Sequence, residues 1–354
     1  MNLKKKMGDW NIFATSTPYA GVSDEFQFYW NVPTFMCHKY GMDFTEVSQN
    51  FSIVQNEGDD FRGDRMAILY DPGDFPALLR DDKGNVVKRN GGVPQQGNLT
   101  LHLDHFRRHV EEQIQDPEFS GVAVIDFESW RPIFRQNWAS LQIYRELSYD
   151  VERQLHPFWS QKAVQQEAAD RFEKSARMFM QRSLELARAL RPRAGWGYYA
   201  YPYCFNWTPN QQSAQCSSKA VEENDGMSWL FGSKTNLYPS VYLRQKLNAS
   251  QRIGLVRGRV QEAVRLSRKA WNRESSRVLP YYWYKYQDQT NVFVNKRDLT
   301  NTLTEAIKRG ADGVVIWGSS NDFNSQTKCR DFYAYLMQIL GPTVYQLKQQ
   351  LDAQ

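Results

Sequence analysis

The chain has 354 residues, of which 41% are hydrophobic, so it can build a sizeable core in one large domain or two ordinary ones. Its formal net charge of +5 comes from basic and acidic residues interspersed along the chain, which indicates a solvated surface rather than a nucleic-acid-binding arm. Zinc-finger spacings and the aromatic RNA-binding signature are missing, and no apolar run approaches the ~18 residues of a membrane span.

Short apolar runs alternate with amphipathic stretches along the chain. The predicted strands are, in order, Phe26–Val32, Met66–Tyr70, Val122–Phe127, Gly195–Ala200, Asn236–Val241, Val278–Tyr284 and Gly313–Trp317. Several are apolar on successive residues, as in strands buried on both faces of a parallel sheet. The predicted helices are Leu99–Ile114, Val164–Leu190, Gln251–Ala270 and Leu299–Arg309, the last with Asp298 or Thr300 as its N-terminal cap.

These repeated β–α units predict an α/β fold, either a (β/α) barrel or a doubly wound sheet. No Gly-x-Gly-x-x-Gly follows the first strand, which disfavours the dinucleotide-binding sheet and favours the barrel. We predict one domain over residues 26–345, a C-terminal tail over 346–354, and an N-terminal extension over 1–25 that is flexible or an expression remnant.

Two carboxylates close the third predicted strand, in Val124-Ile125-Asp126-Phe127-Glu128. Residues two apart on a strand face the same side, and in barrels the chemistry lies at the C-terminal strand ends. Like charges repel, so one carboxyl should have a raised pKa and hold a proton near neutrality, as glycoside hydrolysis requires. A structural ion pair with Arg131 is the alternative. If the substrate carries a 2-acetamido group, Asp126 could orient it while Glu128 protonates the leaving oxygen.

The cysteines and glycosylation sequons concern the compartment. Cys37, Cys204, Cys216 and Cys329 allow three pairings, and none forms a C-x-x-C pair of the kind found in zinc or redox sites. Four N-x-[ST] sequons lie at Asn50, Asn98, Asn206 and Asn248. Together these residues predict an oxidising, secretory route and an extracellular location.

Six longer stretches resemble one known family. They are Gly84–Gln95 (GNVVKRNGGVPQ), Asp126–Trp138 (DFESWRPIFRQNW), Trp196–Cys204 (WGYYAYPYC), Leu237–Leu243 (LYPSVYL), Leu279–Asp288 (LPYYWYKYQD) and Gly313–Ser320 (GVVIWGSS). From about Phe26 to Pro342 the chain is similar to glycoside hydrolase family 56, especially to the hyaluronidases of insect venom and saliva. Matches of this length are highly specific.

The resemblance implies a distorted, TIM-like (β/α) barrel with about seven strands. It also implies endo-hydrolysis of the β-1,4 linkages between N-acetylglucosamine and glucuronate in hyaluronan, with weaker action on chondroitin. The reaction would be retaining and assisted by the substrate's acetamide, without a metal or organic cofactor. The implied catalytic residues are Glu128 as acid, Asp126 as orienting carboxylate, Tyr199, Tyr242 and Trp317.

The same resemblance implies a substrate-binding set and two disulfides. The substrate-binding residues would be Tyr70, Asp71, Arg131, Arg259, Ser319 and Ser320, with the arginines forming a cationic track for the polymer's carboxylates. The disulfides would be Cys37–Cys329 and Cys204–Cys216. An inactive glycosaminoglycan-binding protein on the same fold and a polysaccharide lyase are the competing interpretations.

Two further patterns favour structural roles. His102, His105 and His109 share a helical face without a zinc motif, which predicts a solvated helix surface. The aromatic run Tyr281–Tyr286 resembles a sugar platform, but alternation along a strand predicts that about half of it belongs to the core.

Overall fold

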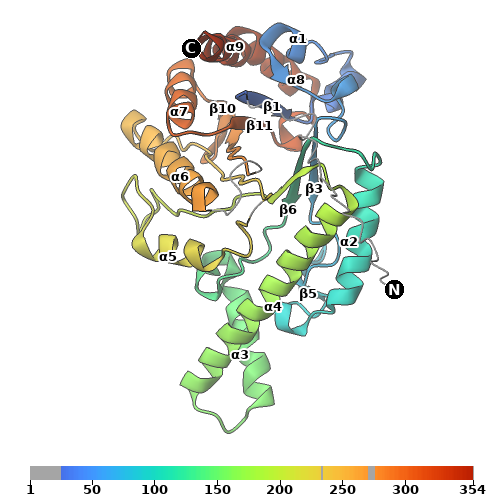
Figure 1. Ribbon diagram of the computed structural model, residues 1–354, viewed down its shortest axis with the longest axis vertical. Helices are drawn as coiled ribbons and strands as arrows, with labels where there is room; N and C mark the ends of the chain where they lie inside the picture. Colours follow the sequence, from blue (N-terminus) through green and yellow to red (C-terminus); the bar gives the residue numbers. More distant parts are fainter. Residues whose placement is uncertain (1–24, 233, 270–275, 354) are drawn as a thin grey trace, which may run out of the picture.

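The computed structural model describes residues 25–232, 234–269 and 276–353, so the predicted N-terminal extension lies almost entirely outside the described residues. In the described part of the chain, parallel strands form a central barrel and helices surround it (Figure 1). The barrel strands are β1 (Gln27–Asn31), β3 (Met66–Tyr70), β6 (Val122–Asp126), β7 (Gly195–Tyr198), β8 (Tyr281–Trp283) and β11 (Gly313–Trp317).

The strands form two parallel sheets that one extended segment joins. β3, β6 and β7 pair in that order, and β11 pairs with β1 on one side and β8 on the other. Residues 236–241 lie between β7 and β8 through isolated parallel bridges such as Tyr199 to Tyr238 and Ser240 to Tyr281. β1 lies beside β3, and the short β2 (Ile53–Val54) pairs with β1. The predicted distorted barrel is confirmed.

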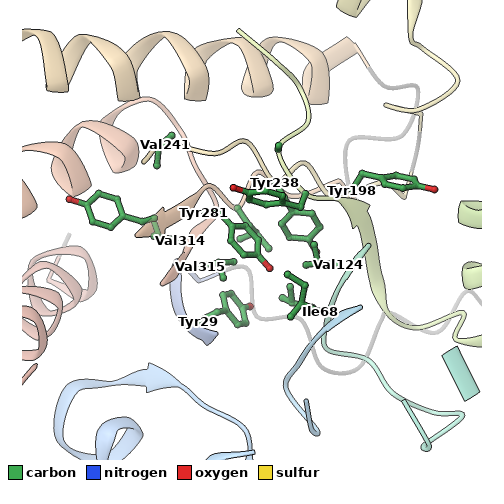
Figure 2. Close-up of a cluster of buried hydrophobic side chains, with 14 of the residues drawn as sticks. Tyr29, Ile68, Val124, Tyr198, Tyr238, Val241, Tyr281, Val314 and Val315 are labelled. Carbon is green, nitrogen blue, oxygen red and sulfur yellow. The ribbon is translucent and has the colours of Figure 1, made fainter. Parts of the chain in front are cut away.

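Continuous apolar sequence explains why these strands form the centre. Side chains such as Ile68, Val124, Tyr281 and Tyr29 converge inside the barrel, where they are buried (Figure 2). Tyr198 points away from this cluster, and its hydroxyl donates to the Met180 carbonyl of the surrounding helix layer, 3.0 Å away. Strands buried on both faces need apolar residues at every position, which is the pattern the sequence shows.

Several predicted strands are shorter than expected, and proline accounts for the two that differ most from their predicted bounds. The segment Asn236–Val241 is held only by isolated bridges, because Pro239 has no backbone N–H to donate to a ladder. β8 begins after Pro280, so the predicted strand Val278–Tyr284 is regular only over Tyr281–Trp283. Antiparallel hairpins lie outside the barrel: β4 (Ala77–Arg80) with β5 (Val86–Arg89), and β9 (Lys285–Tyr286) with β10 (Gln289–Phe293).

The helices are α1 (Val47–Phe51), α2 (Leu99–Gln113), α3 (Gln142–Leu155), α4 (Gln161–Leu190), α5 (Ser218–Gly226), α6 (Ala249–Lys269), α7 (Lys296–Lys308), α8 (Gln326–Tyr335) and α9 (Gly341–Asp352). The four predicted helices correspond to α2, α4, α6 and α7. The capping prediction is wrong: Asn295 caps α7 by accepting from the Asp298 N–H. α3 and α4 form a hairpin that projects from the barrel (Figure 1). α9 continues through most of the segment predicted as a tail, with Leu347 buried.

Both implied disulfides are present. Cys37, in the 3₁₀ helix Thr34–Tyr40, bonds to Cys329 of α8 across 292 residues of sequence. Cys204 bonds to Cys216 across 12 residues. None of the helices in the described part of the chain combines the length and apolar character of a membrane-spanning segment.

Candidate active site

A pocket of about 220 Å³ opens at the C-terminal ends of the barrel strands. Its position follows from the topology, because the last residues of β6, β8 and β11 all face it. All five residues predicted to be catalytic line this pocket, whose walls are Ile68, Asp126, Glu128, Tyr199, Tyr242, Tyr281, Trp283, Gln287 and Trp317. A larger but more open hollow of about 460 Å³ between α2 and α4 is lined by residues such as Leu103 and Leu186 and contains none of the predicted site residues.

The two carboxyls in the pocket have different surroundings. Asp126 ends β6 and is partly buried, whereas Glu128 is exposed in the loop that follows. The pKa of Asp126 is raised to about 8, first by desolvation and then by the negative charges of Glu128 and Asp71. Desolvation also raises the pKa of Glu128, while the cation of Arg131 opposes that rise. A raised pKa was expected in this pair, but the larger rise falls on Asp126 rather than on the predicted acid.

Arg131 does not pair with either carboxyl by an ion pair among the described residues. Its guanidinium donates to the Gln136 carbonyl at 2.7 Å and lies over the rings of Tyr203 and Phe205, at 4.8 and 5.3 Å from their centroids. The alternative interpretation of the two carboxyls as structural partners of Arg131 is therefore wrong. Arg131 acts on Glu128 through the field of its cation, which opposes the rise in the pKa of Glu128.

Aromatic rings form much of the pocket wall. Tyr242 stacks on Trp317 with centroids 5.5 Å apart, and Trp283 meets Trp317 edge-on at 5.4 Å. The Trp317 indole N–H donates to the Tyr70 hydroxyl at 3.0 Å, which fixes the plane of the ring. Desolvation raises the pKa of Tyr199 and of Tyr242 well above the usual value, so both hydroxyls stay protonated and can donate hydrogen bonds.

None of the six predicted substrate-binding residues is among those that line the pocket. Tyr70 ends β3 and is 42% exposed, and Asp71 follows it. Arg259 is engaged by protein groups, because its guanidinium donates to Asn206 Oδ1 at 2.9 Å and to the Ser240 carbonyl at 2.6 Å. A place for Arg259 in an open cationic track is therefore wrong. Ser319 caps the 3₁₀ helix Ser320–Asp322, and neither Ser319 nor Ser320 lines the pocket.

The sequons divide into two groups. Asn50, Asn98 and Asn248 are exposed, so glycosylation at these three stays a prediction. Asn206 is fully buried, and its side-chain amide donates to the Ala214 carbonyl at 2.9 Å. A glycan replaces a hydrogen of that nitrogen and needs solvent, so the prediction for Asn206 is wrong.

Sequence reasoning missed part of the pocket. Tyr281 and Trp283 line it, although they belong to the run that was divided between core and surface, and all five aromatic residues of that run are buried. The aromatic run Tyr281–Tyr286 was the signal that could have identified these pocket residues, because a buried ring can still line a cavity. Nothing in the sequence distinguished Gln287 or Ile68 as pocket residues.

The histidines of α2 are not on a solvated face, so that prediction is wrong. His102 is fully buried, lies 2.7 Å from Ser183 Oγ through Nε2, and has a pKa lowered to about 3, mainly by desolvation. His105 pairs with Asp74, and His109 Nδ1 accepts from the Gly73 N–H at 2.9 Å. Within the described residues, His, Cys, Asp and Glu side chains form no group that could hold a metal ion.

Comparisons with known proteins agree with this geometry. The family model described as hyaluronidase matches residues 16–353. A hyaluronidase of Apis mellifera is 58% identical over 333 residues, covering 94% of this chain and 87% of the relative. A crystal structure of bee venom hyaluronidase in complex with a hyaluronic acid tetramer aligns with a TM-score of 0.89 and 58% identity, covering 91% of this chain and 99% of that chain. An inactive hyaluronidase B of Vespula vulgaris is 41% identical, covering 91% of this chain and 94% of the relative. The chain belongs to the hyaluronidase family, glycoside hydrolase family 56.

Proposed function

We propose that this chain hydrolyses hyaluronan, with Glu128 as the proton donor and Asp126 as the carboxylate that orients the substrate's acetamide group. The observation that carries the proposal is the convergence of both carboxyls with Tyr199, Tyr242 and Trp317 on one pocket at the C-terminal strand ends. The membership of the family and the likeness to a hyaluronidase crystallised with a hyaluronic acid tetramer support this choice of substrate.

The proposed reaction has two steps at the anomeric carbon of N-acetylglucosamine. The acetamide carbonyl oxygen attacks this carbon while the glycosidic bond breaks, and Glu128 gives its proton to the leaving oxygen. A cyclic oxazolinium forms, and its positive charge lies next to Asp126. Glu128, now a carboxylate, then takes a proton from the water that attacks the same carbon, which opens the ring and leaves the configuration retained.

This mechanism requires a proton on Glu128 at the moment when the glycosidic bond breaks, although the pKa of Asp126 is raised as well. In the free site the pKa of Asp126 is raised to about 8 by desolvation and by the charges of Glu128 and Asp71, so this carboxyl can hold a proton near neutrality. As positive charge develops on the acetamide, it favours the ionised form of Asp126 and lowers the pKa of that carboxyl. The proton of the pair is then available at Glu128, where the leaving oxygen needs it. The two carboxyls therefore act as one unit with coupled titrations.

The aromatic wall would support the sugar that reacts. A flat indole such as Trp317 offers its face to the C–H groups of a sugar ring. The hydroxyls of Tyr199 and Tyr242, which stay protonated, can hydrogen-bond the acetamide oxygen and orient it for attack. Chondroitin carries a 2-acetamido group too, so we propose action on that polymer as well, weaker than on hyaluronan. The cation of Arg131, whose field reaches Glu128, can attract the uronate carboxylates of either chain. The two disulfides support an extracellular location for this activity.

Digestion of hyaluronan by the purified protein tests the proposal. New reducing ends and ultraviolet absorbance of the products are followed together, because a lyase leaves an unsaturated, absorbing product and a hydrolase does not. We expect new reducing ends, no absorbance, and retained configuration by proton NMR of the first product. Absorbing products would establish a lyase. Binding without cleavage would favour the inactive glycosaminoglycan-binding protein.

A further inference from the structure

The segment Gly84–Gln95 is one of the six stretches that resemble the family, yet none of its residues lines the pocket. Its Arg89 lies at the end of β5 and reaches toward the active site. The guanidinium forms a bidentate contact with the Asp71 carboxylate, in which Nη1 donates to Oδ2 at 2.6 Å and Nη2 donates to Oδ1 at 2.8 Å. Arg89 Nε donates to the Phe75 carbonyl at 2.8 Å. A bidentate contact fixes both the position and the plane of a carboxylate.

Asp71 is joined to the reactive pair through its backbone. Its N–H donates to the carbonyl of Asp126 at 2.7 Å, directly after Tyr70 pairs with Asp126 in the sheet. The chain turns sharply here, because Asp71 has a φ of 45° in the left-handed region. That conformation is costly for a residue with a side chain and persists only where neighbours hold it. Arg89 is the neighbour that holds the Asp71 side chain.

The rest of the motif holds Arg89 in place. Asn90 donates to the Asp74 carbonyl at 2.7 Å and accepts from the Asn98 N–H at 2.7 Å, which ties the motif to the same loop and to the start of α2. Gly91 and Gly92 have φ of 82°, and a Cβ on Gly91 would lie 2.4 Å from the Gln96 carbonyl oxygen. Only glycine allows the chain to turn this tightly behind Arg89.

We propose that Arg89 is a positioning residue of the active site, which holds the Asp71 carboxylate against the Asp126 end of β6 and so sets the charge that the reactive pair experiences. The proposal rests on the proposed function of Asp126 and Glu128. It gives the motif Gly84–Gln95 a role in the reaction, although the motif does not touch the pocket.

Electrostatics supports the geometry. The negative charge of Asp71 contributes to the raised pKa of Asp126, and the cation of Arg89 is bound to that same charge. Other charged and titratable groups surround Asp126, Asp71 and Arg89. They are Glu128, Tyr199, Tyr242 and Tyr281 in the pocket, Tyr70 and Arg131 beside it in the sequence of β3 and of the loop after β6, Tyr144 on α3, and Asp74, His102, His105 and His109 around the loop after β3. Arg89 is the cation that directly neutralises Asp71 among the described residues.

Removal of either partner should therefore move the pH profile in opposite directions. In Arg89→Gln, the unpaired Asp71 carboxylate repels the ionised form of Asp126 more strongly, so the alkaline limb of kcat/KM moves to higher pH. In Asp71→Asn, that repulsion disappears and the limb moves to lower pH. We also expect Arg89→Gln to lose roughly tenfold or more in kcat, because the reacting groups lose their exact spacing. Arg89→Lys keeps the charge and should keep the wild-type limb while losing part of kcat.

The experiment compares kcat and KM on hyaluronan over a range of pH for the wild type and these variants. Arg80→Gln is the matched control, since Arg80 lies in the same hairpin, is exposed and donates a hydrogen bond to the Gly84 carbonyl of the hairpin turn. Thermal melting of each variant shows that it is folded. If the alkaline limb of kcat/KM stays at the wild-type pH in both Arg89→Gln and Asp71→Asn, the proposal is overturned and Arg89 is a purely structural residue. An inactive wild-type protein would instead overturn the proposed function.

Discussion

Asp126 and Glu128 are separated by one residue, and their different environments suit them to the different tasks proposed for them. Asp126 ends a buried strand, so its ionised form is poorly solvated and the pKa rises to about 8. Glu128 lies beyond the strand, is exposed to the pocket and has the Arg131 cation nearby. A group that must deliver a proton to a substrate needs this access, whereas a group that orients the acetamide can lie deeper.

Replacement of Glu128 by Gln should abolish most turnover. The amide has nearly the same shape but cannot donate a proton to the leaving oxygen, and a general acid contributes roughly 10²- to 10⁴-fold to the rate. Reducing ends released from hyaluronan measure turnover, and calorimetric titration with a hyaluronan oligosaccharide measures binding, which should persist. The exposed Glu118→Gln serves as the control. A Glu128→Gln variant with most of its activity would show that the acid is another group.

The raised pKa of Asp126 also makes a prediction about stability. The folded-state pKa of about 8 exceeds the ordinary value of 3.8, so the folded protein holds a proton that the unfolded chain has released between these pH values. The contribution of the Asp126 carboxyl to the free energy of unfolding is therefore fully present below about pH 3.8, and it is lost as the pH rises toward 8. Asp126→Asn should gain more than ~1 kcal/mol relative to the wild type between pH 4 and pH 8.

Urea unfolding of the wild type and Asp126→Asn at several pH values measures this gain. Asp82→Asn, an exposed substitution of the same kind on the β4–β5 turn, should track the wild type at every pH. A difference between the wild type and Asp126→Asn that does not change with pH would contradict the raised pKa.

At the scale of elements, the sequence predicted the barrel strands better than the helices around them. β3 and β11 have the predicted bounds, because continuous apolar sequence leaves little choice for a doubly buried strand. The segment Asn236–Val241 was predicted as a regular strand, but it is held by isolated bridges. The apolar pattern of the sequence does not account for the backbone N–H that Pro239 lacks. The helices α1, α3, α5, α8 and α9 were missed, because their apolar positions indicate a buried face only when the neighbouring layer is known.

The site shows the same division between local and long-range information. Asp126 and Glu128 were recognisable because the strand that carries them is local. Arg259 resembled a substrate cation, and only the fold reveals that Asn206 and the Ser240 carbonyl occupy its guanidinium. The pairing of Arg89 with Asp71 joins residues 18 apart through a turn and a hairpin, which spacing alone does not predict.

The contact between α2 and α4 should depend on pH through His102. Its pKa of about 3 in the folded protein lies below the ordinary value of 6.5, so the unfolded chain binds the extra proton first as the pH falls. The stability from neutral His102 is full above about pH 6.5 and is lost as the pH falls toward 3. Chemical unfolding at pH 7 and pH 4 should show a smaller loss of stability in His102→Gln than in the wild type.

The comparison requires a histidine that is not buried in the core. His156→Gln, on the α3–α4 hairpin where His156 stacks on Trp159, is that control and should keep the wild-type loss between the two pH values. Equal losses in the wild type and His102→Gln would mean that His102 does not drive acid unfolding.

At the scale of the whole molecule, closure of the barrel brings the two ends of the chain together. β1 and β11 pair along their full length, and α9 packs against α1 and α7. The Cys37–Cys329 bond then joins elements that lie 292 residues apart, outside the pocket. A cross-link restricts the unfolded chain more when its loop is longer, so the two disulfides should differ in their contribution.

Replacement of Cys37 and Cys329 together by Ser should lower the free energy of unfolding by ~6 kcal/mol, against ~3 kcal/mol for Cys204 and Cys216, from chain entropy alone. Urea unfolding of both double variants measures the difference. Because neither cysteine of the long-range bond lines the pocket, we expect Cys37→Ser/Cys329→Ser to keep kcat on hyaluronan at temperatures where it stays folded. An equal loss of stability in both variants would mean that the barrel ends stay associated in the unfolded chain, so that this bond restrains less than its loop length implies.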